Sequence, residues 1–100
     1  MSNNNEVELR INGFCQNIGA PPDIQYSPPI YPQTPTMQDI SKCIGRWTYI
    51  WFWNRRDPVW LYITTVGLDI HRNGKPAVWG CMGTGTRGIY LSDISNFRCD

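Results

Sequence analysis

Hydrophobic and polar residues alternate with the period of a β-strand near the start of this 100-residue chain. Over residues 6–12, the apolar residues Val7, Leu9 and Ile11 are separated by charged residues, so they would share one face of a strand. No strand pattern follows directly, because the next segment is rich in proline. We therefore predict a strand at about residues 6–12 that has no partner close to it in the sequence.

A proline-rich segment at residues 19–38 contains six of the eight prolines. Proline fixes φ and has no amide hydrogen, so this segment is unsuited to a helix or a central strand. It is typical of a polyproline II spacer, which in full extension would reach about 60 Å. Its large apolar side chains are Ile24, Tyr26, Ile30 and Tyr31. We predict that residues 1–42 form an extended arm that reaches away from the remainder of the chain.

From residue 43 onward, short β-type segments are separated by turns. Segments 44–53 and 59–66 are rich in β-branched and aromatic residues and flank a polar turn, which predicts a hairpin. Residues 68–72 lead into Asn73 and Gly74, a strong hairpin signal because both turn positions need positive φ. Further strands are expected at residues 77–82, 89–91 and 96–99, with one helical turn at 92–95. Residues 43–100 are thus predicted to be an all-β module of five short strands, a barrel or a β-sandwich.

The five tryptophans all lie between residues 47 and 79. Alternation places Trp47, Tyr49 and Trp51 on one face of the first strand, opposite Ile50 and Phe52, so we expect both faces to be covered. In a thin module, three or four tryptophans are expected in the core, because each buries about 200 Å². The alternative is that Trp53 and Trp60, beside the Arg55–Arg56 turn, stay exposed as stacking platforms for a ligand or a neighbouring subunit.

Patterns for catalysis and for metal binding are weak. Residues 83–88 spell G-x-G-x-x-G, but too few residues follow for a dinucleotide-binding βαβ unit, so a turn is predicted there. The single histidine, His71, precedes the Asn-Gly turn and is expected at the surface, which leaves no base for a Ser or Cys nucleophile. The four cysteines form no C-x-x-C pair. We predict a protein that is not an enzyme and that uses no metal and no cofactor.

Charge and hydropathy argue against two kinds of partner, nucleic acids and membranes. Nine basic and eight acidic residues are spread along the chain, and the net charge is +1, so no nucleic-acid-binding surface is predicted. No apolar run is long enough for a membrane span, and no apolar run follows the polar first residues, so we expect no secretory signal.

The order of the strands, with one helical turn before the last, resembles small SH3-like and Sm-like barrels over residues 44–99. First and last strands are neighbours in such barrels, so the resemblance implies a disulfide between Cys43 and Cys99, with Cys81–Cys99 as the alternative. Cys15 would then bond Cys81 of a neighbouring chain. The Asn-rich start, the expected lack of a signal and the Cys-bounded β-module are also similar to small coat and appendage proteins of endospore-forming bacteria, which would place the chain at a cell or spore surface.

Two functions are compatible with these features. The first is a structural protein that self-assembles into a filament or surface layer: Val7, Leu9 and Ile11 would add a strand to another copy, and intersubunit disulfides would fix the joint. Ordering the arm costs about 1 kcal/mol per residue, which its low apolar content cannot offset alone. The second is an SH3-like binding module with an aromatic groove for an extended peptide or a glycan, whose arm tethers it or folds back over it.

Overall fold

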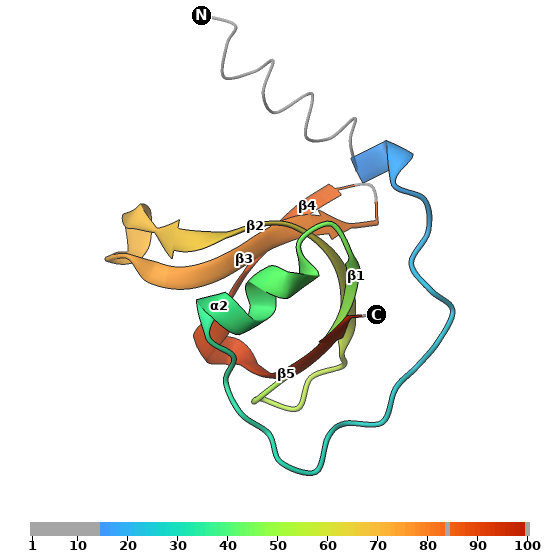
Figure 1. Cartoon of the computed structure of the whole chain (residues 1–100), viewed down its shortest axis with the longest axis horizontal. Helices are drawn as coiled ribbons and strands as arrows, with labels where there is room; N and C mark the ends of the chain where they lie inside the picture. The colour runs from blue at the N-terminus through green and yellow to red at the C-terminus, as the bar shows by residue number, and fades with distance from the viewer. Residues whose placement is uncertain (1–14, 84, 100) are drawn as a thin grey trace, which may run out of the picture.

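The computed structural model describes residues 15–83 and 85–99. Five strands within these ranges form one curled antiparallel sheet (Figure 1). The strand order is β4-β3-β2-β1-β5, so the first strand pairs with both the second and the last. The strands are β1 (Trp47–Phe52), β2 (Val59–Asp69), β3 (Lys75–Met82), β4 (Gly85–Tyr90) and β5 (Ile94–Cys99). Within the described ranges the edge strands β4 and β5 do not pair, so the sheet does not close into a barrel. The all-β prediction is confirmed, with five strands.

Short helical turns connect and cover the strands: α2 (Met37–Ile40), η1 (Ser41–Cys43), η2 (Ile70–Arg72) and η3 (Leu91–Asp93). The Thr36 hydroxyl starts α2 by accepting a hydrogen bond from the Asp39 amide at 3.1 Å. Figure 1 shows α2 over the open side of the curled sheet, where Ile40 and Cys43 are buried. This helix was not predicted, although Thr36 and Asp39 have the spacing of a capping box.

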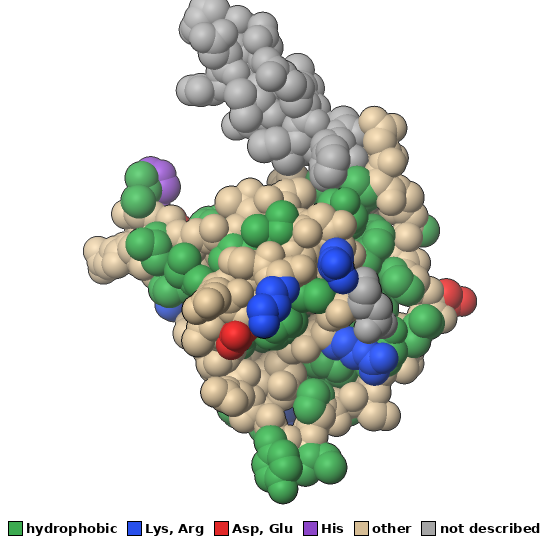
Figure 2. Space-filling view, in the orientation of Figure 1, with side chains coloured by type: hydrophobic (Ala, Val, Ile, Leu, Met, Phe, Trp, Pro, Cys, Tyr) green, Lys and Arg blue, Asp and Glu red, His purple; other side chains and the backbone are tan. Residues whose placement is uncertain are grey.

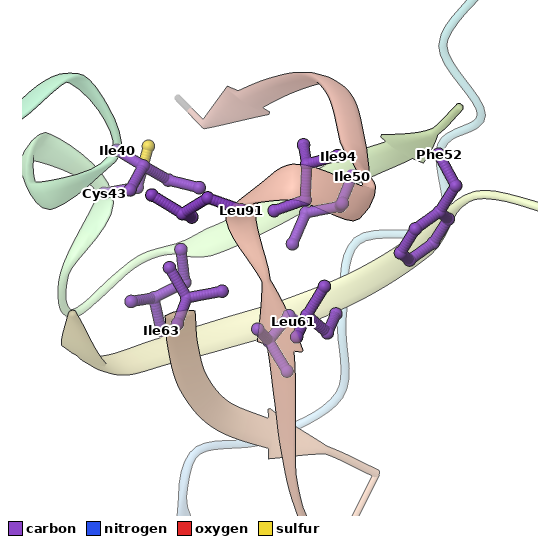
Figure 3. Packing of buried hydrophobic residues seen from close by; sticks show 10 residues of the cluster. Ile40, Cys43, Ile50, Phe52, Leu61, Ile63, Leu91 and Ile94 are labelled. Atoms are coloured by element: carbon purple, nitrogen blue, oxygen red, sulfur yellow. The ribbon is translucent and has the colours of Figure 1, made fainter. Parts of the chain in front are cut away.

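The hydrophobic core lies on the inner face of the sheet, beneath α2 and η1 (Figure 3). Its buried members are Ile40, Cys43, Ile50, Phe52, Leu61, Ile63, Val78, Ile89, Leu91 and Ile94. No tryptophan belongs to this cluster, so the prediction that most tryptophans form the core is wrong. The physical reason is alternation along β1: because Ile50 and Phe52 point inward, the neighbouring Tyr49 and Trp51 must point outward.

The outer face of β1 is nevertheless covered, as the sequence predicted. Tyr49 and Trp51 are buried, and their rings meet edge to face with centroids 5.0 Å apart. Trp47 is half-buried and packs against Tyr62 of β2, with ring centroids 5.6 Å apart. Tyr49 and Trp51 therefore form a second buried layer outside the sheet, whereas the buried Phe52 belongs to the inner core.

The turn between β2 and β3 has the predicted conformation at its two signal residues. Asn73 has φ 58° and Gly74 has φ 73°, the positive values that Asn-Gly favours. The predicted segments 59–66 and 68–72 form one strand, β2, which ends at Asp69 because residues 70–72 form η2. His71 is exposed in this turn, in agreement with the prediction.

In the glycine-rich segment, residues 85–88 belong to β4, which corrects the prediction of a turn over residues 83–88. Gly83 turns the chain with φ 66°, and β4 then starts at Gly85. Gly88 lies opposite Trp79 of β3, and the Trp79 ring covers it, because a Cβ at Gly88 would be 2.8 Å from that ring. Gly88 therefore serves strand packing, whereas Gly83 supplies the positive φ of the turn.

Two disulfides join parts of the chain that are far apart in sequence. Cys43 and Cys99 are bonded with a Cα separation of 5.8 Å, so the predicted bond between the two ends of the module is confirmed. Cys15 is bonded to Cys81 of the same chain, with a Cα separation of 5.3 Å. The expectation that Cys15 bonds a neighbouring chain is therefore wrong for this structure. The predicted strand at 6–12, with Val7, Leu9 and Ile11, lies outside the described residues.

Candidate functional site

Three aromatic residues on the outer side of β1 and β2 form the candidate site. Tyr49 and Trp51 project from β1, and Trp60 projects from the position on β2 that pairs with Tyr49. The rings of Tyr49 and Trp60 are tilted to each other with centroids 4.9 Å apart. We call Tyr49, Trp51 and Trp60 the aromatic face. It exists because alternation sends every second residue of the strand away from the core.

The proline-rich arm lies against the aromatic face. Its Tyr26 ring meets Tyr49 and Trp60 edge to face, with centroid separations of 5.5 Å and 5.9 Å. On the side of β5, the guanidinium carbon of Arg98 is 3.8 Å from the centre of the Tyr26 ring. Arg98 is in place because it pairs with Tyr49 in the β1–β5 register. Tyr26 thus occupies a site made by three adjacent strands.

Two indole N–H groups hold the arm at separate points. Trp60 Nε1 donates to the carbonyl oxygen of Ile24 at 3.2 Å, and Trp53 Nε1 donates to the Thr34 hydroxyl at 2.8 Å. The arm also adds one backbone bond, from the Gln33 amide to the Ser95 carbonyl at 2.7 Å. A proline-rich chain has few amide donors but keeps its carbonyl oxygens, so side-chain N–H donors suit it well.

Between these two points the arm stands away from the sheet. Residues 27–32 are exposed, and the chain bends at Ile30 and Tyr31 (Figure 1). A cavity of about 850 Å³ lies between this part of the arm and the module, with Trp51 and Trp53 among its lining residues. The cavity lies within the range of volumes of small-ligand and peptide-anchor sites.

One donor beside the cavity lacks an acceptor. Trp51 is 7% exposed, and within residues 15–83 and 85–99 its buried Nε1 has no hydrogen-bond partner. A buried N–H without a partner costs about 1–3 kcal/mol. The docked arm therefore leaves one polar group of the site unsatisfied, which a ligand or a shifted arm carrying an acceptor would correct.

The turn after β1 supplies the charged rim of the cavity. The amide of Arg56 donates to the Asn54 side chain at 3.1 Å, and Arg55 has φ 61°, so the turn has a defined shape. Arg56 holds its guanidinium 3.8 Å from the centre of the Phe52 ring. Because Arg55, Arg56 and Asp57 all line the cavity, its rim has a net positive charge.

Trp53 and Trp60, the two tryptophans proposed from the sequence, both lie at this site but differ in how far they are exposed. Trp53 is 47% exposed, whereas Trp60 is half-buried because Tyr26 packs on it. Their role as platforms for a ligand stays a prediction. Sequence reasoning missed Tyr26 and Arg98 as parts of the site, since only the β1–β5 register brings Arg98 beside Tyr49. The signal that was available for Tyr26 was its position among the few large apolar side chains of the arm.

The arm does not reach away from the module over its described residues, which corrects that prediction. The reason is that Tyr26 finds a matching site, while the carbonyl oxygen of Ile24 finds an indole donor. The other large side chains of the bend contribute nothing to docking, because Ile30 and Tyr31 are each 85% exposed.

Other chemistry in the described part of the chain is structural. The Tyr90 hydroxyl donates to the Asp69 carboxylate at 2.7 Å, and this bond raises the pKa of Tyr90 above its ordinary value. No group of three His, Cys, Asp or Glu side chains comes together in residues 15–83 and 85–99. The helices in these ranges also lack the length and apolar character of a membrane-spanning helix.

No protein-family model matches this chain, and searches of curated protein sequences and of solved structures also find no match.

Proposed function

We propose that this chain is a non-catalytic binding module that recognises an extended, proline-rich segment on its aromatic face. One observation carries the proposal: such a segment, the arm of the chain itself, already lies there with Tyr26 between Tyr49, Trp60 and Arg98. The arm acts as a ligand in cis, and a segment of similar chemistry from another molecule competes with it.

The topology supports an SH3-like type of module. The strand order, the pairing of β1 with β5 and the single 3-10 turn η3 before the last strand all agree with that type. In such modules proline-rich segments bind in aromatic grooves, because a polyproline II chain is already extended and loses little entropy on binding. The outer face of β1 already holds such a segment, because Tyr26 of the arm packs on Tyr49.

Self-assembly and a glycan ligand for the binding module, both inferred from the sequence, remain proposals with less support from the described residues. Self-assembly into a filament or surface layer through the strand at 6–12 depends on residues outside the described ranges. A glycan in the cavity would use Trp51 and Trp53 for stacking, but the arm contacts favour a peptide. An oligosaccharide therefore belongs among the test compounds.

The test is a fluorescence titration of a full-length variant whose arm is released. Cys15→Ser removes the covalent link to Cys81, and Tyr26→Ala removes the ring contacts with the aromatic face. A synthetic peptide with the sequence of residues 20–36 is then added while tryptophan emission is recorded. We expect a saturable change, because Trp60 and Trp53 contact this segment in cis.

Two controls decide the interpretation. The same peptide carrying Tyr26→Ala should bind at least about fivefold more weakly, because it lacks two edge-to-face ring pairs worth about 0.5–1.5 kcal/mol each. Equal binding of both peptides would refute recognition by the aromatic face. A response to a neutral oligosaccharide without a response to the peptide would refute the proposal in favour of a glycan site.

A further inference from the structure

We infer that the aromatic face accepts the arm of a second copy of this chain, so that copies exchange residues 15–26. This inference rests on the proposed function, because it uses the same face and names the partner. In the exchanged state, Tyr26 of one copy would lie on the aromatic face of the other, and Cys15 would bond the Cys81 of that other copy.

The contacts that hold residues 15–26 on the module are preserved when two copies exchange arms. Every contact between residues 15–26 and the module has an identical counterpart in a second copy, so exchange loses none of them. These contacts are the Cys15–Cys81 bond, the Trp60–Ile24 hydrogen bond and the rings around Tyr26. The balance between the closed chain and the exchanged pair is therefore set by concentration and by the connecting segment.

Residues 27–32 connect the exchanged part of the arm to the module, and their sequence favours an extended course. The sequence of this segment is Ser-Pro-Pro-Ile-Tyr-Pro, in which every residue except Ile30 is a proline or precedes one. Prolines and the residues before them favour extended backbone, so the segment alone favours a straight course of about 19 Å. In the closed chain it bends instead at Ile30 and Tyr31 (Figure 1).

Little in the closed chain holds this bend. Residues 27–32 make no hydrogen bond with any residue in the described ranges. Ile30 and Tyr31 are each 85% exposed, and Figure 2 shows hydrophobic side chains projecting at the bottom of the view, where the arm turns. The cavity of about 850 Å³ lies beneath the same segment. Straightening the segment therefore breaks few contacts and directs residues 15–26 away from their own sheet.

Closure within one chain is the competing state. A short flexible connection gives the arm an effective concentration of about 1 mM at its own face, so exchange needs a high protein concentration or a connection that resists closing. The proline-rich segment is a connection of the second kind. A reciprocal exchange closes a dimer, because the second arm docks within the pair that the first arm has formed.

The covalent step uses a small disulfide, such as oxidised glutathione, as the oxidant. The thiols of Cys15 and of Cys81 in the other copy lose two protons and two electrons and form one disulfide. The oxidant accepts both and leaves as two thiols. The two chains joined by this disulfide can then be identified, which shows which copy supplied the arm.

The experiment mixes two full-length variants with tags of different mass. One carries Cys15→Ser and the other carries Cys81→Ser, so a Cys15–Cys81 bond in the mixture must join two chains. After joint refolding at high concentration in glutathione buffer, a non-reducing gel should show a heterodimer of about twice the 11.5 kDa chain mass. Neither variant alone should give this species, and peptide mapping should find Cys15 joined to Cys81.

A matched mixture of Cys43→Ser and Cys99→Ser serves as the control. Cys43 and Cys99 join η1 to β5 within the module, and no proline-rich hinge separates these elements, so no comparable heterodimer is expected. In the Cys15 and Cys81 mixture, adding Pro28→Ala and Pro29→Ala to both chains should reduce the heterodimer about fourfold or more, because the hinge then bends more easily. An unchanged yield would overturn the role of the hinge.

The outcomes separate this inference from the proposed function. If the mixture stays monomeric while the peptide of residues 20–36 binds the released variant, arm exchange is overturned and recognition of the segment stands. If a heterodimer forms but is joined through Cys43 or Cys99, exchange is also overturned. A Cys15–Cys81 heterodimer, together with wild-type chains of two tag sizes that form mixed dimers as concentration rises, supports it.

Discussion

Replacing Tyr26 by Ala should weaken the docked arm while leaving the core of the module in place. Tyr26 makes two edge-to-face ring contacts, with Tyr49 and Trp60, and it accepts the Arg98 guanidinium on its ring. Each ring pair is worth about 0.5–1.5 kcal/mol beyond its buried area, and an exposed cation–π contact about 0.5–1 kcal/mol. The expected loss of unfolding free energy is therefore about 1.5–4 kcal/mol.

The assay is urea unfolding of the oxidised full chain, followed by near-UV and far-UV circular dichroism. Near-UV signals should fall before any denaturant is added, because the rings of Tyr49 and Trp60 lose an ordered neighbour. Far-UV signals should persist, because Tyr26 is not part of the buried core cluster. A shift of the thermal midpoint by about 4–8 °C per kcal/mol gives an independent measure for a domain of this size.

Tyr31→Ala is the matched control, since it removes the same side chain from the same arm. Tyr31 is 85% exposed and makes no hydrogen bond or ring contact with residues 15–83 and 85–99. Its replacement should change the free energy of unfolding by less than about 0.5 kcal/mol. If both variants lose the same stability, the ring contacts around Tyr26 do not hold the arm and the reasoning about the site fails.

Three further predictions test the fold. Gly80→Ala should cost more than about 3 kcal/mol in urea unfolding, because its Cβ would overlap the carbonyl oxygen of Tyr62, whereas Gly85→Ala meets no atom within 4 Å and should be nearly neutral. Cys43→Ser should cost about 4 kcal/mol, the chain-entropy value for a loop of this length, and equal stability of the two oxidised proteins would contradict it. The hydrogen bond to Asp69 raises the pKa of Tyr90 above 10.0, the pKa of this group in the unfolded chain. The bond therefore stabilises the fold fully below pH 10.0, and this stabilisation is lost as the pH rises through the folded-state pKa. Wild type should therefore lose more stability than Tyr90→Phe above that pH, and parallel pH profiles would exclude this linkage.

The local elements of this protein can be predicted from its amino-acid sequence. Asn73 and Gly74 predicted a turn with two positive φ values, because few other residue pairs adopt them easily. Alternating aromatic and β-branched residues predicted β1 and β2, since strand period is a local property. The disulfide between Cys43 and Cys99 was implied by the resemblance to SH3-like barrels, in which the first and last strands are neighbours, and no local pattern would have indicated it.

Which aromatic residues form the candidate site depends on the folded sheet and could not be predicted from local patterns. Both faces of β1 are apolar, so periodicity defines two faces but does not say which one meets the core. In the folded sheet, Ile50 and Phe52 lie on the face that packs in the core. Likewise, proline content predicts an extended arm but gives it no direction. The direction comes from Tyr26 meeting Trp60, a contact between residues far apart in the chain. Such contacts depend on strand register and packing, which form only when the whole sheet has folded.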